Sequence, residues 1–336
     1  MPERQSVLVS VDDSPEFPTT LGRARRYAQQ LDAPLSLVSV LYDPYVAGRR
    51  FGDSEGLKKL RRAVMQRELE GLEVLCNDIA KSGLEVSGRV VWDRPKADAL
   101  ARQVMALDPL MLVVSAHRTR LVDKLLLSYT DWQVLSRVPC PVLRVADRPY
   151  ADKPVIAVAV DPMHDNDKPA AFDDRLIASA AGICDGLGGE LALLHAVQDL
   201  QAVVMLTAPG GGAMPVADAD LQTALEDEHR KRLQALAERH GVDRRNLHVA
   251  SGIDTMILSE FAESLRADVM VMGVVSRSRF KEVVIGNTAE RLIERLSCDL
   301  LAVKPEGFEC PVQQSSDVDV LSTGAIKPPA SAVESG

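Results

Sequence analysis

Residues 272–292 combine glycines, small polar side chains and basic side chains at a spacing that could bind an anion. The stretch reads MGVVSRSRFKEVVIGNTAERL and contains the pattern G-x-x-S-x9-G-N-T. Its defining residues are Gly273, Ser276, Gly286, Asn287 and Thr288. Backbone N–H groups at a helix N-terminus bind phosphate because they lack partners and lie at the positive end of the helix dipole. Glycine allows the positive φ and the close approach that such a loop needs.

A capped turn is the alternative interpretation of the same stretch. Asn287 and Glu290, three residues apart, form a capping-box pattern, and Gly286 could serve the turn alone. The three basic side chains within residues 276–281 favour an anion site in an acidic protein, although basic loops are often only solvated. The residues themselves leave both interpretations open.

Two further candidates lie at the ends of apolar runs. Asp161 ends the run 155–161, and Val197 ends the run 190–197. Open α/β sheets bind ligands at the carboxyl ends of their strands, but an aspartate at such a place also caps helices. His195 has no nucleophile or metal-ligand partner at a recognisable spacing, which predicts a packed or exposed histidine and not a catalyst.

Composition narrows the class of protein. The 336 residues carry a formal charge of -9 with a pI of about 5.3, which argues against nucleic acid or an anionic membrane as the partner. No apolar run approaches the roughly 20 residues that span a bilayer, and no signal peptide is recognised. Five scattered cysteines without a CxxC pair predict neither disulfides nor a zinc site. We therefore expect a cytoplasmic protein with a small-molecule ligand.

The chain repeats itself. SVLVSVDDS, starting at residue 6, resembles PVIAVAVDP, starting at residue 154, with Asp12 placed over Asp161 at an offset of 149 residues. Residues 112–145 lie over residues 270–303 without a gap, at an offset of 158 residues. Internal repeats of this kind indicate duplicated structural units.

Short apolar runs alternate with amphipathic stretches in each half, which is typical of parallel strands buried on both faces. Each half is therefore predicted to be a five-stranded doubly wound α/β domain, residues 1–148 and 149–305. Residues 306–336, rich in Ser, Pro and Gly, are expected to be disordered. The insertion 203–219 is expected to be a mobile loop or lid, or a solvent-exposed insertion.

These features together resemble the universal stress protein family over residues 5–305. The resemblance rests on the strand that ends in Asp12 or Asp161, on the alternation of strands and helices, and on the glycine loop. The segments IGNTAE (285–290) and YTDWQVL (129–135) resemble the tandem-domain E-type members of the family. The resemblance implies two tandem Rossmann-like domains of the HUP type (adenine nucleotide alpha hydrolase-like), each with a parallel sheet of order 3-2-1-4-5. It also implies a stress-response protein without enzymatic activity, from a family in which one subclass binds ATP and another does not.

The resemblance places an ATP site in the second half, by the family pattern G-x-x-G-x9-G-S/T. This sequence departs from it at Ser276 and supplies the hydroxyl one place late, at Thr288. In the first half Ser115, Arg118 and Ser128 stand at the three glycine-type positions, so no nucleotide is expected there. Weak ATP binding in the second half is expected, with Asp161 and Val197 at the adenosine end.

The sequence also bears on two other function classes. A nucleotidyl-transfer or pyrophosphatase enzyme would need motifs such as SGGxDS or HIGH, and the sequence contains neither. A carrier of an apolar small molecule or lipid, held between paired halves near 203–219, remains the alternative. The final strands 141–145 and 300–304 are expected to pair within one chain as an intramolecular pseudo-dimer, which would cover two sheet edges, and further self-association is left open.

Overall fold

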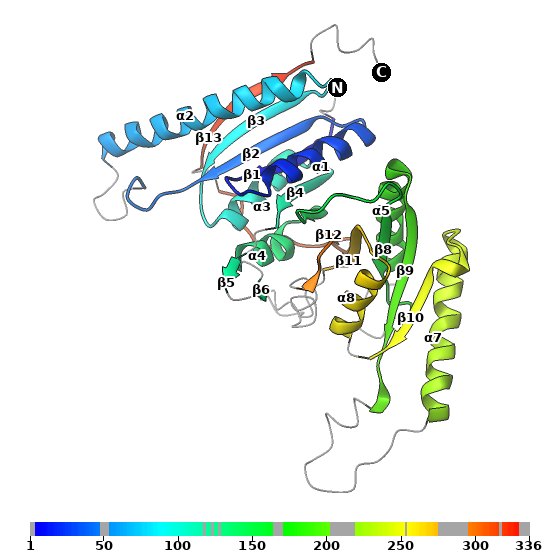
Figure 1. Ribbon diagram of the computed structural model, residues 1–336. Coiled ribbons are helices and arrows are strands. Elements are labelled where there is room, and N and C mark those ends of the chain that lie inside the picture. Colours follow the sequence, from blue (N-terminus) through cyan, green and yellow to red (C-terminus); the bar gives the residue numbers. More distant parts are fainter. Residues whose placement is uncertain are drawn as a thin grey trace, which may run out of the picture.

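The computed structural model describes residues 4–47, 54–116, 119–121, 124–126, 129–163, 171–201, 219–252, 254–274, 295–315 and 318–328. Within them, eleven strands form one sheet with helices on its faces, and a separate hairpin has two strands (Figure 1). The strand order is β10-β9-β8-β11-β12-β7-β4-β1-β2-β3-β13. The two halves of the chain therefore share a single continuous sheet.

The first half supplies the sheet order β3-β2-β1-β4-β7, in which all neighbours are parallel. Its strands are β1 (Val7–Val11), β2 (Leu35–Leu41), β3 (Val86–Trp92), β4 (Met111–Ser115) and β7 (Val142–Val145). Its helices are α1 (Phe17–Gln30), α2 (Glu55–Ala80), α3 (Lys96–Leu107) and α4 (Tyr129–Arg137). The hairpin strands β5 (Thr119–Leu121) and β6 (Lys124–Leu126) lie between β4 and α4.

The second half supplies the order β10-β9-β8-β11-β12, again parallel throughout. Its strands are β8 (Val155–Ala159), β9 (Glu190–Val197), β10 (Leu247–Ser251), β11 (Val269–Gly273) and β12 (Asp299–Val303). Its helices are α5 (Phe172–Leu187), α7 (Ala219–Arg239), α8 (Asp254–Ser264) and the short 3-10 turn η1 (Arg244–Asn246). Both halves thus have the order 3-2-1-4-5.

Apolar burial explains why these segments form strands and helices. Leu8 and Val9 of β1 point to opposite faces and are both fully buried, so the strand is covered by helices on each side. On α1, Ala24 and Ala28 are buried one turn apart and form the face that packs on the sheet. The helices cover apolar runs that would otherwise face water.

Strand register shows which residues of the two halves correspond. Val7 pairs with Met111 in the first half, as Ile156 pairs with Val269 in the second, and these pairings keep the offset of 149 residues for the first strand. Continuing along the second strands, Leu35 pairs with Val7 and Leu191 pairs with Ile156. Ser39 therefore corresponds to His195, and Leu41 corresponds to Val197.

The halves are joined through their last strands. β12 pairs with β7 in antiparallel orientation, with Leu300 opposite Arg144 and Ala302 opposite Val142. This is the pairing expected for 141–145 and 300–304. Each strand would otherwise present a row of unpaired backbone groups at a sheet edge, so the pairing satisfies both edges at once.

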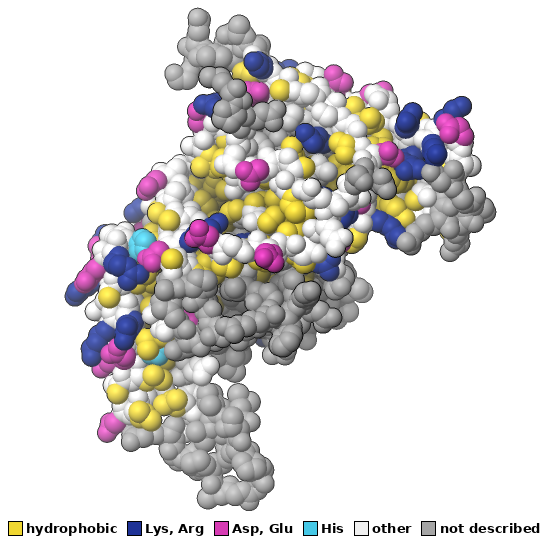
Figure 2. Space-filling view, turned by 180° about the vertical axis from the view of Figure 1, so that it is seen from behind, with side chains coloured by type: hydrophobic (Ala, Val, Ile, Leu, Met, Phe, Trp, Pro, Cys, Tyr) yellow, Lys and Arg dark blue, Asp and Glu magenta, His cyan; other side chains and the backbone are white. Residues whose placement is uncertain are grey.

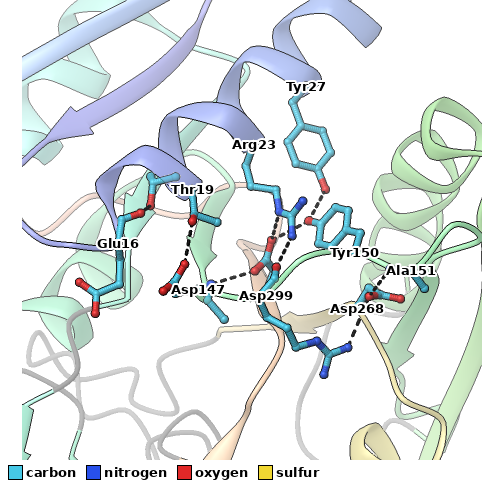
Figure 3. A network of polar contacts seen from close by, with 12 residues as sticks. Glu16, Thr19, Arg23, Tyr27, Asp147, Tyr150, Ala151, Asp268 and Asp299 are labelled. Carbon is cyan, nitrogen blue, oxygen red and sulfur yellow. Dashed lines mark hydrogen bonds and ion pairs between the residues drawn. The ribbon is translucent and has the colours of Figure 1, made fainter.

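Asp299, the first residue of β12, is the centre of a buried polar network at this junction (Figure 3). Its carboxylate accepts hydrogen bonds from the backbone N–H of Ala146 at 2.8 Å and from the Tyr150 hydroxyl at 2.6 Å. Arg23 of α1 adds an ion pair, with Nε 3.2 Å from the carboxylate. A buried carboxylate is tolerated when its lone pairs are satisfied in this way.

Two tyrosines and the Arg23 side chain complete the network. Because Tyr150 donates to Asp299, the Tyr27 hydroxyl must donate to the Tyr150 oxygen, 3.1 Å away. The Arg23 guanidinium lies over the Tyr150 ring, 3.2 Å from its centroid, and donates to the Arg148 carbonyl at 2.5 Å. Burial raises the pKa of Tyr27 to about 12 and also raises the pKa of Tyr150, so both hydroxyls remain donors at neutral pH.

A buried lysine makes a second link between the halves. Lys304 follows β12, and its Nζ donates to the carbonyls of Leu135 at 2.5 Å and Ser136 at 3.3 Å, in the last turn of α4. Helix C-terminal carbonyls lack backbone partners, so the ammonium satisfies them and complements the helix dipole. Burial lowers the pKa of Lys304 to about 7.

The expectation of disorder for residues 306–336 is wrong for part of that segment. β13 (Asp319–Ile326) pairs antiparallel with β3 and packs beside α2, so the red strand lies against the cyan one in Figure 1. A bulge between Ser322 and Ala325 directs the Thr323 hydroxyl to the backbone N–H of Gly88, at 2.9 Å. The first half therefore carries a sixth strand that the repeat does not predict.

Gly88 of β3 packs closely against the tail strand. A Cβ at this position would meet Thr323 Cγ2 and Cys76 Sγ, each at 3.3 Å. By the strand register, the second half has Leu247 at the corresponding position on β10. The missing side chain of Gly88 leaves room for Thr323 on β13 and for Cys76 on α2.

The surface carries both signs of charge. On the face seen in Figure 2, basic and acidic side chains are interspersed around hydrophobic ones. None of the helices in the described ranges combines the length and apolar character needed to cross a membrane.

The first prediction concerns the tail strand. Gly88→Val should displace β13, because the new side chain collides with Thr323, and amide hydrogen exchange of residues 319–326 should become faster. Thr323→Ala, at a partly exposed position, should also make the exchange of residues 319–326 faster, but by less. Gly71→Ala, whose Cβ meets nothing within 4 Å, is the control. Unchanged exchange of 319–326 in Gly88→Val would show that β13 does not depend on this contact.

The second prediction concerns pH. Burial raises the pKa of Asp299 from 3.8 to about 6, so between these values the native state keeps a proton that the unfolded chain has lost. The free energy of unfolding contributed by Asp299 therefore rises as pH falls through 6. Asp299→Asn cannot titrate, so the stability of the unsubstituted protein relative to this variant should increase by about 1 kcal/mol between pH 7 and pH 5. Denaturant unfolding at both pH values measures the difference, and a decrease would contradict the assignment.

Candidate functional site

Three of the predicted site residues come together at the carboxyl edge of the second half. β8 lies between β9 and β11 in the sheet, Val197 and Gly273 are the last residues of those two neighbours, and Asp161 follows β8. Parallel strands place these ends along one edge, where α/β sheets hold ligands. The other predicted residues, Ser276, Gly286, Asn287 and Thr288, lie outside the described residues.

Gly273 is required by packing. The ring of Phe172, the first residue of α5, lies against it so closely that a Cβ on residue 273 would be 2.3 Å from Cε1 of the ring. Phe172 is buried. The bare Cα of this glycine therefore faces an aromatic side chain, which is a structural reason for glycine that the sequence pattern does not reveal.

Val197 is fully buried, and its backbone is committed to the sheet. Ser251 of β10 pairs with it, and its carbonyl accepts a hydrogen bond from the Gly252 N–H at 2.9 Å. A carbonyl oxygen has a second lone pair, so this atom keeps acceptor capacity.

The backbone at Asp161 is held by two buried side chains. The Asp161 N–H donates to both carboxylate oxygens of Asp173, each at 3.2 Å. The preceding carbonyl, of Val160, is 3.0 Å from Nδ1 of His195. Asp173 lies in the first turn of α5, where a carboxylate is favoured by the helix dipole.

His195 is paired with a second histidine. Its Nε2 is 2.6 Å from Nδ1 of His229 on α7, and the two rings are stacked with centroids 5.0 Å apart. Burial, followed by the effect of His229, lowers the pKa of His195 despite the hydrogen bond to Val160. His195 is therefore neutral at pH 7, and of the two outcomes that the sequence predicts, packed or exposed, it is packed.

A further polar cluster lies at the end of β10. The Ser251 hydroxyl donates to Glu226 of α7, and Gln222 Nε2 is 3.0 Å from the same carboxylate and 3.2 Å from the Ser251 oxygen. The Leu200 N–H, just beyond β9, donates to Gln222 Oε1 at 3.1 Å. Hydrogen bonds, first from Ser251 and then from Gln222, lower the pKa of Glu226.

The same edge of the first half is built differently. Thr20 donates to Ser115, the counterpart of Gly273, at 3.0 Å, and both side chains are fully buried. Ser39, the counterpart of His195, donates to Glu68 at 2.8 Å. The chain after Ser115 forms the hairpin β5–β6. The first half thus has buried hydroxyl side chains at Ser39 and Ser115, where the second half has His195 and Gly273.

In the described part of the chain, no three His, Cys, Asp or Glu side chains are arranged to hold a metal ion. Sequence reasoning did not identify Phe172, Asp173 or His229 as members of the site. Their partners lie 12 to more than 100 residues away, so no local motif marks them; the only signal is the acidic pair at the start of α5.

Comparison with protein families gives a match over both halves. The family described as "Universal stress protein family" matches residues 3–146 and 155–304. A relative named Universal stress protein E from Photorhabdus laumondii is 24% identical over 323 residues, which cover 94% of this chain and 100% of the relative. The protein of the same name from Escherichia coli K12 is 23% identical over 318 residues, which cover 94% and 98%.

Solved structures show the same fold. A functionally unknown protein from Pseudomonas aeruginosa PAO1 aligns with a TM-score of 0.69 at 21% identity, covering 90% of this chain and 93% of that one. A universal stress protein from Archaeoglobus fulgidus aligns with a TM-score of 0.57 at 16% identity, covering 89% and 98%. At these identities the likeness concerns the fold.

The third prediction tests the contact at Gly273. Gly273→Ala should destabilise the protein by about 1–3 kcal/mol, because the methyl group overpacks against the Phe172 ring. Phe172→Leu in the same chain should recover part of this loss, since the smaller side chain makes room. Denaturant unfolding measures both. Gly182→Ala on α5, where a Cβ meets nothing within 4 Å, is the matched control, and equal stability of the two alanine variants would refute the contact.

Proposed function

Because the chain belongs to the universal stress protein family, we propose that it is a cytoplasmic, non-enzymatic stress-response protein whose second half binds ATP or another small anionic ligand weakly. The family contains members that bind ATP and members that do not. The proposal is therefore specific about the half of the chain and about the class of ligand.

One observation carries the proposal: Asp161, Val197 and Gly273 lie at the ends of neighbouring strands on one edge of the sheet. This edge is where parallel α/β sheets bind ligands. At this edge the second half has the polar cluster of Ser251, whereas the first half has the buried Thr20–Ser115 pair; Asp161 and its counterpart Asp12 are both partly exposed. The asymmetry supports a ligand in the second half.

The described residues fit a nucleotide in part. Asp161 and the carbonyl of Val197 have the chemistry to accept hydrogen bonds from a ribose or an adenine. Gly273 does not offer its bare Cα to a phosphate, since Phe172 fills that space. The phosphate end would then rest on Ser276, Gly286, Asn287 and Thr288. ATP, when bound, would supply the negative charge that these backbone and hydroxyl donors favour.

The apolar-carrier alternative gains no support from the described junction. On the side of α1, the two halves meet through Arg23, Tyr150 and Asp299, which fill the space with hydrogen bonds (Figure 3). A cavity for a lipid would need an apolar lining. The insertion 203–219 lies, apart from its last residue, outside the described residues.

The fourth prediction is tested by calorimetric titration of Mg-ATP into the full chain. Binding at a micromolar Kd corresponds to about 8 kcal/mol, and a non-glycine residue at positive φ costs roughly 1–2 kcal/mol. Ser276→Gly should therefore tighten binding about 5- to 30-fold. Gly286→Val should abolish binding, because its side chain blocks the approach to the loop, and Asp161→Ala should weaken it.

Asp12→Ala is the matched control, since Asp12 is the counterpart of Asp161 in the first half. It should leave the affinity unchanged. Weaker binding in Asp12→Ala together with normal binding in Asp161→Ala would place the ligand in the first half and contradict the proposal. If even Ser276→Gly binds no ATP, residues 276–288 form a capped turn and the nucleotide proposal fails.

A further inference from the structure

His195 and Asp173 form a grip on the peptide group between Val160 and Asp161, because each makes a hydrogen bond to one of its two polar atoms. Its carbonyl oxygen is 3.0 Å from His195 Nδ1, and its N–H points to the Asp173 carboxylate at 3.2 Å. His195 and Asp173 are 3% and 1% exposed. Buried hydrogen bonds of this kind are costly to break, because the freed groups have no water to replace the lost partner.

The geometry fixes the proton positions in the grip. A carbonyl can only accept, so His195 Nδ1 carries the hydrogen and Nε2 is an acceptor. His229 Nδ1 must then donate to Nε2 across the 2.6 Å contact. The pKa of His195 is lowered by burial, which keeps the ring in the neutral form that this arrangement requires. His229 thus selects the tautomer through which His195 holds Val160.

Different side chains and hydrogen bonds are found at the corresponding positions of the first half. Ser39 stands where the second half has His195, and its hydroxyl donates to Glu68 at 2.8 Å. Asp12, the counterpart of Asp161, uses its own carboxylate to accept from the Ser14 N–H at 2.9 Å. The grip therefore occurs in the half that carries the candidate site, which argues against a general requirement of the fold.

We propose that His195 and Asp173, supported by His229, are positioning residues that fix the backbone at Asp161 and so orient this residue for ligand binding. The inference rests on the proposed function of the second half. A side chain whose backbone is already fixed loses less freedom when a ligand binds, so the grip should increase affinity without touching the ligand.

Two amide substitutions separate the two nitrogens of His195. In His195→Asn the side-chain N–H₂ lies near the position of Nδ1 and can still donate to Val160; in His195→Gln it lies near the position of Nε2 and cannot. Titration of Mg-ATP into the full chain should give an affinity close to that of the unsubstituted protein for Asn. For Gln the affinity should be about tenfold weaker, the effect of losing one buried hydrogen bond. Ser39→Ala, at the corresponding position of the first half, should change nothing.

A second readout does not depend on any ligand. Nitrogen-15 NMR of the histidine rings should show His195 protonated at Nδ1, and the Asp161 amide should exchange slowly with solvent. His195→Gln should accelerate that exchange, and His195→Asn should not. If His195→Gln does not fold, His229→Leu serves instead: it should mix the His195 tautomers and accelerate the exchange to a smaller extent.

The outcomes separate the two proposals. Absence of ATP binding to the unsubstituted protein would contradict the proposed function alone, and the grip is then judged by exchange of the Asp161 amide. Equal affinities together with equal exchange rates for the Asn and Gln variants would overturn the inference. A His195 ring protonated at Nε2 and not at Nδ1 in the unsubstituted protein would overturn it as well.

Discussion

The antiparallel pairing of β7 with β12 is the interaction on which the rest of the structure depends. It joins two five-stranded parallel sheets into one and places the buried carboxylate of Asp299 at the seam. Hydrogen bonds from the Ala146 N–H and the Tyr150 hydroxyl, with the ion pair to Arg23, fix how the halves meet. Removing any one donor would leave a desolvated charge with too few partners, so this seam must form as a unit.

The pairing of β7 with β12 at the centre of the sheet leaves the outer strand of each half, β3 and β10, without a partner from the repeat. The first half covers its outer strand with β13, which Gly88 admits, while Leu247 makes the corresponding edge of the second half unlike it. The carboxyl edges have diverged as well: Ser115 is closed off by Thr20, whereas Gly273 packs against Phe172 with polar side chains nearby. The two copies of a duplicated unit thus differ in the side chains at their carboxyl edges and in the covering of their outer strands.

The sequence predicts five strands in each half, and the structure has them, because each is a short apolar run between amphipathic stretches. It does not predict β13, since DVLSTGAI is only partly apolar and its place depends on a glycine more than 200 residues away. Asp161, Val197 and Gly273 are placed correctly at one edge by strand ends alone. Phe172, Asp173 and His229 act through contacts that only folding creates, so no spacing rule could find them.

The central claim is that the carboxyl edges of the two halves differ and that the ligand binds at the carboxyl edge of the second half. Amide hydrogen exchange of the full chain, followed by mass spectrometry with and without Mg-ATP, tests this most directly. The account predicts slower exchange in peptides covering 155–163 and 190–201, with no change in the corresponding peptides 7–14 and 35–45. Slowing confined to the first half, or equal in both halves, would contradict it.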